Sequence, residues 1–562
     1  MRILVLQTTR MGDVLQTSPL IHMIRAQYPD AHITVMVRRM GKVIVEHHPD
    51  VDEVLTYDED AMFLDMRSSD SDRLLNAYQA ADQRVQELKA GHYDLLYNVT
   101  HSIGSAMLMK LVDIPQVSGA YLSDDWQFIL RGRWTTYFFT SVFSRDYNDL
   151  NLCDITRNFA GAAPPCRKLL FEVCGEERAF TAALLDEHGV SADDFVACLQ
   201  LGASENNKRW IEERFAGLAQ LLVERYNAKI FLLGVAEEAP LGEVFEQHAP
   251  GLAIPLYGKT SIPQVAALLE RAQILVTNDT GTMHIAAAVN CPITLVSVGN
   301  VHYRETGPYG EGHCAIEWRR RTLGRSDYVP GGVEARAQIL PEQVLRAIEC
   351  VLANNGARPL QQLDEPPELS SVDLFMTRFA PDGCLQFYPV IRRPMTPRDF
   401  MRIAYRAMWL DHLESNHDKR AETESVRLML GHYNGPEAET LQAWREELGG
   451  MFAELAQIAQ RGVQTTTRLL DVLKKGKDLA RAKQLVAQLM ALDEEARIFS
   501  EMNPPCRPLI LLARFERDNL EGADPLRLAQ TTLDIYRACF TRARLTEKKI
   551  TRIAEMWAEG NE

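Results

Sequence analysis

The sequence lacks any run of about 20 apolar residues, the length a helix needs to cross a bilayer, so no segment is expected to span a membrane. It also lacks an excess of basic residues. Its 76 acidic residues outnumber its 61 lysines and arginines, which gives the 562-residue chain a formal net charge of −15. This charge argues against a general nucleic-acid-binding surface, and no nucleic-acid partner is expected.

Paired cysteine motifs are missing as well. The 10 cysteines show no C-x-x-C spacing, so we interpret them as reduced thiols of a cytoplasmic protein and expect no metal site. The N-terminus does not resemble a secretory signal, because the short apolar run after Arg2 ends at the polar segment Gln7–Arg10. A G-x-G-x-x-G fingerprint is also absent after this first apolar run, which argues against a dinucleotide-dependent oxidoreductase.

Apolar runs that alternate with helical patterns predict two α/β domains. The strands expected in the first domain, residues 1–165, span 2–6, 32–37, 53–55, 94–98 and 117–120. The strands expected in the second domain, residues 166–355, span 195–201, 229–233, 274–277 and 293–297. Such alternation is typical of a parallel sheet covered by helices on both faces. The linker between the two domains is expected at Ala162–Pro165.

The last third of the chain has a different character. Residues 356–396 form a proline-rich linker, in which Leu374–Val390 is expected to hold a short hairpin around the turn dipeptide Asp382-Gly383. From 397 to 562 the apolar residues recur at helical spacing, which predicts a helical bundle. Breaks between its helices are expected at Asn434–Pro436, Asn503–Pro505 and Glu521–Pro525.

The segment Ile274–Ala288 carries the strongest functional signal. A buried strand ends at Asn278 and turns at Asp279-Thr280-Gly281 into a helix, which places free N–H groups and a positive dipole end at the carboxyl edge of the sheet. Such an edge can bind a pyrophosphate. The alternative is an ordinary turn in which Asp279 or Thr280 caps the helix.

A second signal follows the first strand. The apolar run Ile3–Leu6 leads into a polar turn with Gly12 and Asp13, and then into a helix. Open α/β sheets bind ligands at this edge, where a carboxylate could take a proton from a substrate hydroxyl. The alternative role for Asp13 is again that of a helix cap.

Together these segments resemble glycosyltransferase family 9, the ADP-heptose heptosyltransferases. The matching motifs are Met11-Gly12-Asp13, Leu201–Trp210, Leu232–Glu238, Tyr257–Pro263 and Asp279-Thr280-Gly281-Thr282-Met283-His284. They occur in the family's order, and the resemblance covers about residues 1–355. It implies a GT-B architecture, with the acceptor in the first Rossmann-like domain and the nucleotide sugar in the second. The helical extension lies outside it.

The resemblance also implies roles for particular residues. Asp13 is the expected catalytic base, and Lys208, helped by Ser204, is the expected counter-charge for the donor diphosphate. The other donor-binding residues that it implies are Glu238 (or Glu237) at the ribose, Thr260 at the adenine, Asp279 at the loop or donor sugar, Thr280, Gly281 and Thr282 at the phosphates, and His284 at phosphate or sugar. Arg10 and Lys42 are candidates on the acceptor side. Lys208 as a surface lysine and His284 as a packed core residue are the alternatives. Ala203 departs from the family, which often has a hydroxyl residue there.

The leading hypothesis is therefore an inverting, metal-independent transferase without a cofactor. It would move heptose from an ADP-sugar to a lipopolysaccharide core or another surface glycan. Two alternatives stay open: a transferase of the same fold with a protein acceptor or another nucleotide sugar, and a scaffold protein with a degenerate transferase domain. A lipid-linked acceptor would suit peripheral attachment to the cytoplasmic face of the inner membrane. Arg131–Phe139 is the candidate contact for it, or else a core element.

Overall fold

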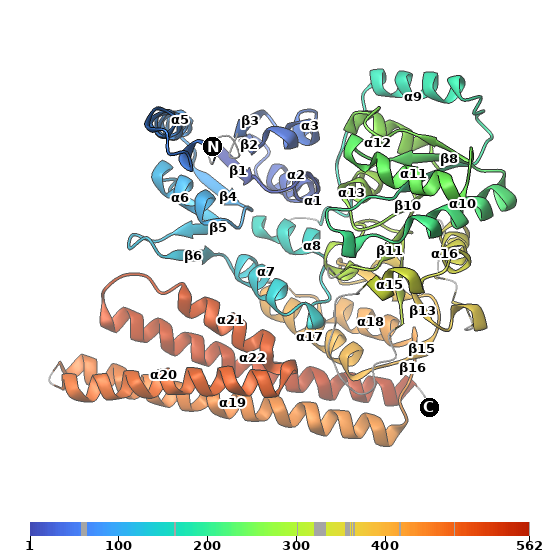
Figure 1. The fold of residues 1–562 in the computed structure, drawn as a ribbon. Coiled ribbons are helices and arrows are strands. Elements are labelled where there is room, and N and C mark those ends of the chain that lie inside the picture. Colours follow the sequence, from blue (N-terminus) through green and yellow to red (C-terminus); the bar gives the residue numbers. More distant parts are fainter. Residues whose placement is uncertain are drawn as a thin grey trace. The chain divides into compact units, whose positions relative to one another are not determined.

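The described part of the chain contains two large sheets with intervening helices, a two-stranded sheet of β15 Arg393–Pro394 and β16 Tyr433–Asn434, and a helical extension (Figure 1). This computed structural model describes residues 1–57, 64–161, 165–299, 302–319, 333–354, 360, 362–363, 366–414, 417–476 and 478–560. Most of the linker expected at 162–165 lies outside these residues, as do residues 356–359, 361 and 364–365 of the linker expected at 356–396. The chain forms two compact units, one of residues 1–6, 58–149 and 394–562, the other of residues 7–57 and 150–393.

The first sheet has six strands in the order β3-β2-β1-β4-β5-β6. Their bounds are β1 Arg2–Gln7, β2 His32–Arg38, β3 Glu53–Tyr57, β4 Leu95–Asn98, β5 Gln116–Leu122 and β6 Phe128–Arg131. Strand β4 is parallel to β1 and β5, β2 is parallel to β3, and β6 runs antiparallel to β5. This order is that of a doubly wound sheet. The five strands predicted for this domain are confirmed, and β6 was not predicted.

The helices associated with these strands are α1 Met11–Gln16, α2 Ser18–Gln27, α3 Lys42–Val45, α5 Ser71–Ala90, α6 Ile103–Val112, α7 Arg133–Phe143 and α8 Leu152–Arg157. Helix α7 covers most of the aromatic segment considered as a lipid contact. Its Trp134, Tyr137 and Phe138 side chains are buried, so they belong to the core and not to a membrane-facing surface.

The second sheet has eight strands in the order β14-β13-β12-β11-β10-β7-β8-β9. Their bounds are β7 Val196–Gln200, β8 Lys229–Leu233, β9 Ala253–Pro255, β10 Ile274–Thr277, β11 Ile293–Ser297, β12 Cys314–Trp318, β13 Val372–Phe379 and β14 Leu385–Pro389. Strands β7 to β12 pair in parallel, and the four strands predicted here are among them. The predicted hairpin around Gly383 is present as β13 and β14, and it joins this sheet because β13 pairs antiparallel with β12.

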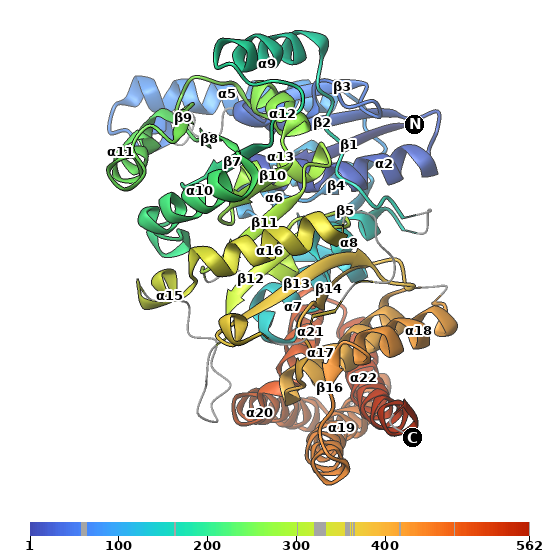
Figure 2. The same cartoon turned by 90° about the vertical axis from the view of Figure 1, so that its right-hand side faces the viewer.

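The helices of the second sheet are α9 Gly175–Glu187, α10 Glu212–Tyr226, α11 Ala239–His248, α12 Ile262–Arg271, α13 Gly281–Ala288, α14 Tyr303–Thr306, α15 Val333–Gln338 and α16 Pro341–Asn354. Figure 2 shows α10 and α16 side by side over the sheet, where they contact each other. They close an apolar core that contains the fully buried Trp210 and Phe215.

The extension is helical from residue 397, as predicted. Its helices are α17 Pro397–Leu413, α18 Lys419–Leu430, α19 Ala438–Lys475, α20 Leu479–Met502, α21 Arg507–Asp518 and α22 Pro525–Gly560. The predicted breaks at 434–436 and 503–505 fall between helices, and the one at 521–525 ends at the first residue of α22. Helices α19 and α22 pack along their length with α20 beside α19 (Figure 1). They approach closely at Gly462, where a Cβ atom would lie 2.3 Å from the ring of Tyr536.

The extension packs on α7 and β6 of the first sheet. The Tyr137 ring lies 4.9 Å from that of Trp409, and the Phe139 ring lies 6.0 Å from that of Phe515. The Asn519 amide also binds the backbone of β6. Its Oδ1 accepts from the Leu130 N–H at 2.7 Å, and its Nδ2 donates to the Leu130 carbonyl at 2.9 Å. The edge strand β6 of the first sheet thus forms hydrogen bonds with the extension.

A charged cluster joins three helices of the extension. Glu422 of α18 accepts hydrogen bonds from Lys549 of α22, and Lys549 also pairs with Asp411 of α17 at 3.0 Å. The His417 ring lies between Glu414, at 3.3 Å, and Glu422. Burial would lower the pKa of His417, but the hydrogen bonds to the two carboxylates outweigh it and raise the pKa to about 9.

This cluster predicts a loss of stability at alkaline pH. The folded pKa of His417 lies above its unfolded value of about 6.5, so its contribution is complete below pH ~6.5 and is lost as pH rises through about 9. We expect the urea midpoint of the wild type to fall between pH 7 and pH 10, and His417→Gln to remove that part of the slope. Equal slopes for the two proteins would contradict the prediction.

All ten cysteines are free thiols, as predicted from their spacing, and only Cys174 is not fully buried. No helix in the part of the chain that the structure describes has the length and apolar character that crossing a bilayer requires.

Candidate functional site

The turn after β1 packs against the start of α13, both within the second unit. A Cβ atom on Gly12 would lie 3.0 Å from Cδ2 of His284, and one on Gly281 would lie 3.4 Å from the methyl group of Met11. Glycine at these two positions lets the two backbones approach. The contact brings together the two segments that carry the strongest sequence signals.

Asp13 lies in the first turn of α1 and is half-buried. Its Oδ2 accepts a hydrogen bond from the Arg10 backbone N–H at 3.2 Å. This is the cap interaction considered as the alternative role for Asp13. Arg10 itself is exposed at the N-cap position. Because the cap bond uses one oxygen, it leaves room for a second role of the carboxylate.

His284 is buried under Gly12. Burial lowers its pKa to about 4, and the charge of nearby Asp13 opposes this shift only in part. The ring is therefore neutral at pH 7 and supplies no positive charge to a phosphate. Its Nδ1 has no hydrogen-bond partner among the described residues.

The N-terminus of α13 carries the threonines expected at the phosphates. Thr280 is the N-cap residue, and its Oγ1 lies 3.2 Å from Oγ1 of Thr277. The Thr282 hydroxyl donates to Oε1 of Gln200 at 3.1 Å. Gly281 and Thr282 start the helix, so their backbone N–H groups have no carbonyl of the same helix to bind. Asp279, next to the cap, is half-buried.

Gln200 connects this helix to Glu238. Its Nε2 donates to Oε2 of Glu238 at 3.1 Å, and the same oxygen accepts from the Val235 backbone N–H at 3.2 Å. Glu238 is half-buried, whereas Glu237 is exposed, so Glu238 is the acid that the fold places here. A Cβ atom on Gly202 would lie 1.7 Å from Oε1 of Glu238, so the carboxylate occupies space that only a glycine leaves open.

Asn278 fixes the loop that precedes α10. Its Nδ2 donates to the Leu201 carbonyl at 2.8 Å, and its Oδ1 accepts from the Trp210 backbone N–H at 2.8 Å. The Trp210 indole donates to the Ile339 carbonyl at 3.0 Å, which anchors the end of the loop in the core. Gln200 and Asn278 were not among the predicted site residues. The sequence feature that could have indicated them is a polar residue at the carboxyl end of each of the two buried strands β7 and β10.

Lys208 lies in this loop, and its side chain is only 7% exposed. Its Nζ pairs with Glu205 at 3.3 Å, so the alternative of a solvated surface lysine does not describe it. Ser204 is exposed. Ala203 stands where the family often has a hydroxyl residue. Its backbone carbonyl accepts two hydrogen bonds from the Arg209 guanidinium, at 3.1 and 3.3 Å.

The two other predicted residues make none of these contacts. Lys42 is exposed on α3 and pairs with Glu46 at 3.8 Å. Thr260 is half-buried, two residues after Gly258, whose N–H donates to the Gly234 carbonyl at 3.0 Å. The structure thus joins the turn of Asp13 to Gly281 and His284, and links Glu238 to Thr282.

Comparisons with known proteins agree with this architecture. Residues 83–322 match the sequence profile of glycosyltransferase family 9 (heptosyltransferase). Lipooligosaccharide heptosyltransferase 2 of Haemophilus influenzae is 24% identical over 364 residues, which cover 63% of this chain and 100% of that protein. Lipopolysaccharide heptosyltransferase 3 of Escherichia coli is 24% identical over 286 residues, 50% of this chain and 79% of that protein.

A solved structure shares the fold. The glycosyl transferase family 9 protein from Veillonella parvula superposes with a TM-score of 0.51 at 22% identity, and the match covers 63% of this chain and 97% of that one.

The two Rossmann-like sheets and these matches define a glycosyltransferase of GT-B architecture. More narrowly, its α/β part resembles the family 9 glycosyltransferases of the heptosyltransferase-like kind, and a helical C-terminal extension follows this part.

Proposed function

We propose that this enzyme transfers heptose, or a related sugar, from an ADP-sugar to a hydroxyl group of a lipopolysaccharide core or another surface glycan. We further propose that the transfer inverts the anomeric configuration and needs neither a metal nor another cofactor. The names of the relatives, which are lipooligosaccharide and lipopolysaccharide heptosyltransferases, support the sugar and the acceptor class. The single observation that carries the proposal is the contact of Gly12 with His284, which brings the Asp13 turn to the start of α13.

In this mechanism Asp13 takes the proton of the acceptor hydroxyl. At the same time the oxygen of that hydroxyl forms a bond to the anomeric carbon of the donor sugar. The bond from that carbon to the diphosphate breaks, and ADP leaves with the electron pair. A carboxylate is a weak base, so the proton moves late in the attack. Attack on the face opposite the diphosphate inverts the anomeric centre.

The leaving diphosphate gains negative charge as the bond breaks. The N–H groups of Gly281 and Thr282 at the helix start and the ammonium of Lys208 are the groups proposed to stabilise it. Glu238, held in place by a hydrogen bond from Gln200, is proposed to accept hydrogen bonds from the ribose hydroxyls. Because His284 is neutral, its part is to support the Asp13 turn and not to add charge.

Lys208→Ala is expected to weaken ADP binding at least tenfold, or about 1.4 kcal/mol. Its partner Glu205 is 47% exposed, so the substitution leaves no buried unpaired charge and the fold should survive. Calorimetric titration of wild type and variant with ADP and ADP-heptose, without added metal, measures the effect. Glu205→Gln is the matched control, and it should bind ADP at least as tightly as the wild type. Unchanged affinity in Lys208→Ala would contradict the donor assignment.

Product analysis tests the reaction itself. The enzyme is incubated with ADP-heptose, ADP-glucose or UDP-glucose and a heptose-deficient lipopolysaccharide, with and without EDTA. We expect transfer from ADP-heptose, unaffected by EDTA, into a linkage of inverted configuration. Transfer only from another nucleotide sugar would keep the enzyme class but reject heptose, and loss of transfer in EDTA would reject metal independence.

A further inference from the structure

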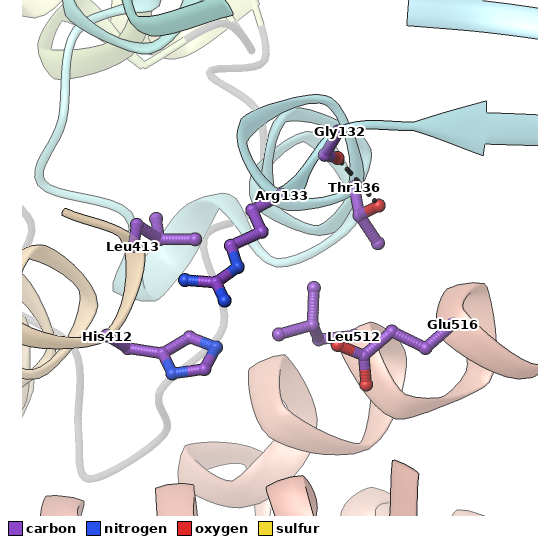
Figure 3. A pocket seen from close by; sticks show the side chains of 7 residues that line it. All are labelled: Gly132, Arg133, Thr136, His412, Leu413, Leu512 and Glu516. Carbon is purple, nitrogen blue, oxygen red and sulfur yellow. Dashed lines mark hydrogen bonds between the residues drawn. The ribbon is translucent and has the colours of Figure 1, made fainter. Parts of the chain in front are cut away.

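A cavity of about 310 Å³ opens within the first unit, where the start of α7 meets the extension helices α17 and α21 (Figure 3). Its polar side chains come from Arg133 and Thr136 of α7, His412 of α17 and Glu516 of α21. The glycosyl-transfer mechanism uses none of these residues. Sites for small molecules typically measure about 300–1,000 Å³, so the cavity suits a ligand at the small end of that range.

An arginine of α22 fixes the polar groups on one side of the cavity. Arg542 donates to both carboxylate oxygens of Glu516, one of them at 2.9 Å, and its Nε donates to Nε2 of His412 at 3.0 Å. The Glu516 charge is therefore matched by Arg542. Because Nε2 of His412 accepts a hydrogen bond, the ring is neutral and carries its proton on Nδ1.

Arg133 leaves the cavity with an unmatched positive charge. It is exposed, and no residue of the described chain forms an ion pair or hydrogen bond with its guanidinium. Figure 3 shows this group facing the His412 ring. Burial, then the charges of Arg542 and Arg133, lower the pKa of His412 to about 4, while Asp411 opposes them. Because Glu516 and Arg542 neutralise each other, the Arg133 guanidinium is the charge that favours an anion in the cavity.

Apolar side chains complete the lining. Leu413 and Leu512 are buried, and both line the cavity next to the charged groups (Figure 3). A free inorganic ion would leave this surface unused. A ligand that combines an anionic group with a short apolar body would satisfy both parts.

We propose that this cavity binds a small organic anion, whose phosphate or carboxylate group pairs with Arg133 and whose apolar body lies against Leu413 and Leu512. A guanidinium matches either group through two parallel hydrogen bonds. The lining residues belong to three helices of the first unit, α7, α17 and α21. A bound ligand would therefore also link α7 to the extension. The proposal does not depend on the identity of the sugar donor.

The test is calorimetric titration of the full-length protein with n-butyl phosphate, butyrate and inorganic phosphate. We expect n-butyl phosphate or butyrate to bind several-fold more tightly than inorganic phosphate, and Arg133→Ala to weaken that binding at least tenfold. Arg527→Ala removes another exposed arginine of the same unit, on α22, and should bind like the wild type. Arg133 is exposed, so its removal should leave the melting temperature unchanged.

The same titrations can overturn the proposal. Absence of binding for all three probes at 10 mM or equal binding by Arg133→Ala would reject it, and so would tighter binding of inorganic phosphate. If the anion still binds Arg133→Ala but no longer binds when the protein is saturated with ADP, the anion binds at the donor site and not in this cavity. A second readout is the His412 ring pKa, followed by NMR and assigned with His412→Asn. It should rise from about 4 when the anion binds, and no movement would contradict the assignment.

Discussion

Asp13→Asn is expected to lower kcat by about 10²–10⁴-fold, the usual contribution of a general base. The substitution is informative because asparagine retains a side-chain oxygen that can accept the Arg10 N–H, as Oδ2 of Asp13 does at 3.2 Å. The cap of α1 is therefore preserved while the proton acceptor is removed. ADP affinity and the melting temperature should stay at wild-type values. Steady-state kinetics with calorimetry for ADP measures the effect.

Asp13→Ala separates the two roles of the residue. It removes the base and the cap together, so it should lose the same activity and also about 0.5–2 kcal/mol of stability. If Asp13 acted only as a cap, Asp13→Asn would remain active and only Asp13→Ala would be impaired. That outcome would reject the proposed mechanism.

Asp154→Ala is expected to reduce the free energy of unfolding by about 3–5 kcal/mol, because it leaves a buried arginine without its charge partner. Asp154 is completely buried and pairs with Arg157 at 2.9 Å. It also accepts from the Tyr309 hydroxyl at 2.9 Å and from the Leu385 backbone N–H at 2.8 Å. The residue therefore ties α8 to β14 and to the segment before β12. Urea denaturation followed by circular dichroism measures the change.

Two further variants identify the cause. Asp154→Asn keeps one acceptor oxygen for the Leu385 N–H, and its NH2 group can donate to the Tyr309 hydroxyl, which then donates to the Cys166 carbonyl at 3.1 Å. It lacks only the charge, so it should lose less stability than Asp154→Ala. Asp154→Leu combined with Arg157→Met removes both charges, and it should recover part of the loss because no buried charge is left unpaired. A double variant as unstable as Asp154→Ala would show that the hydrogen bonds matter more than the ion pair.

The sequence predicts most of the strands and the turns that follow them, because long apolar runs and turn residues are local signals. Strands β6, β9 and β12 were not predicted. The bond from Gln200 to Glu238 joins residues 38 positions apart, and that from Thr282 to Gln200 joins residues 82 apart. Contacts between residues so far apart leave no periodic pattern in the sequence, so neither bond could be predicted from it. The same holds for the burial of His284 under Gly12, which depends on how two helices pack.

The roles of individual side chains were predicted from the family motifs and not from pattern alone. Pattern left Asp13 as either a base or a cap, and the structure contains the cap bond without excluding the base. The position of the extension was equally beyond prediction. Its helices were readable from spacing, but the aromatic contacts of Phe139 with Phe515 join residues from opposite ends of the chain.

The pairing of Asn519 with Leu130 makes the extension a structural substitute for one more strand. The side-chain amide presents a donor and an acceptor to the edge of β6, as the backbone of a neighbouring strand would. A protein shortened to the length of its relatives would therefore expose a strand edge beside the aromatic surface of α7, a combination that favours self-association. The extension therefore also acts as a guard against edge-to-edge association of β6.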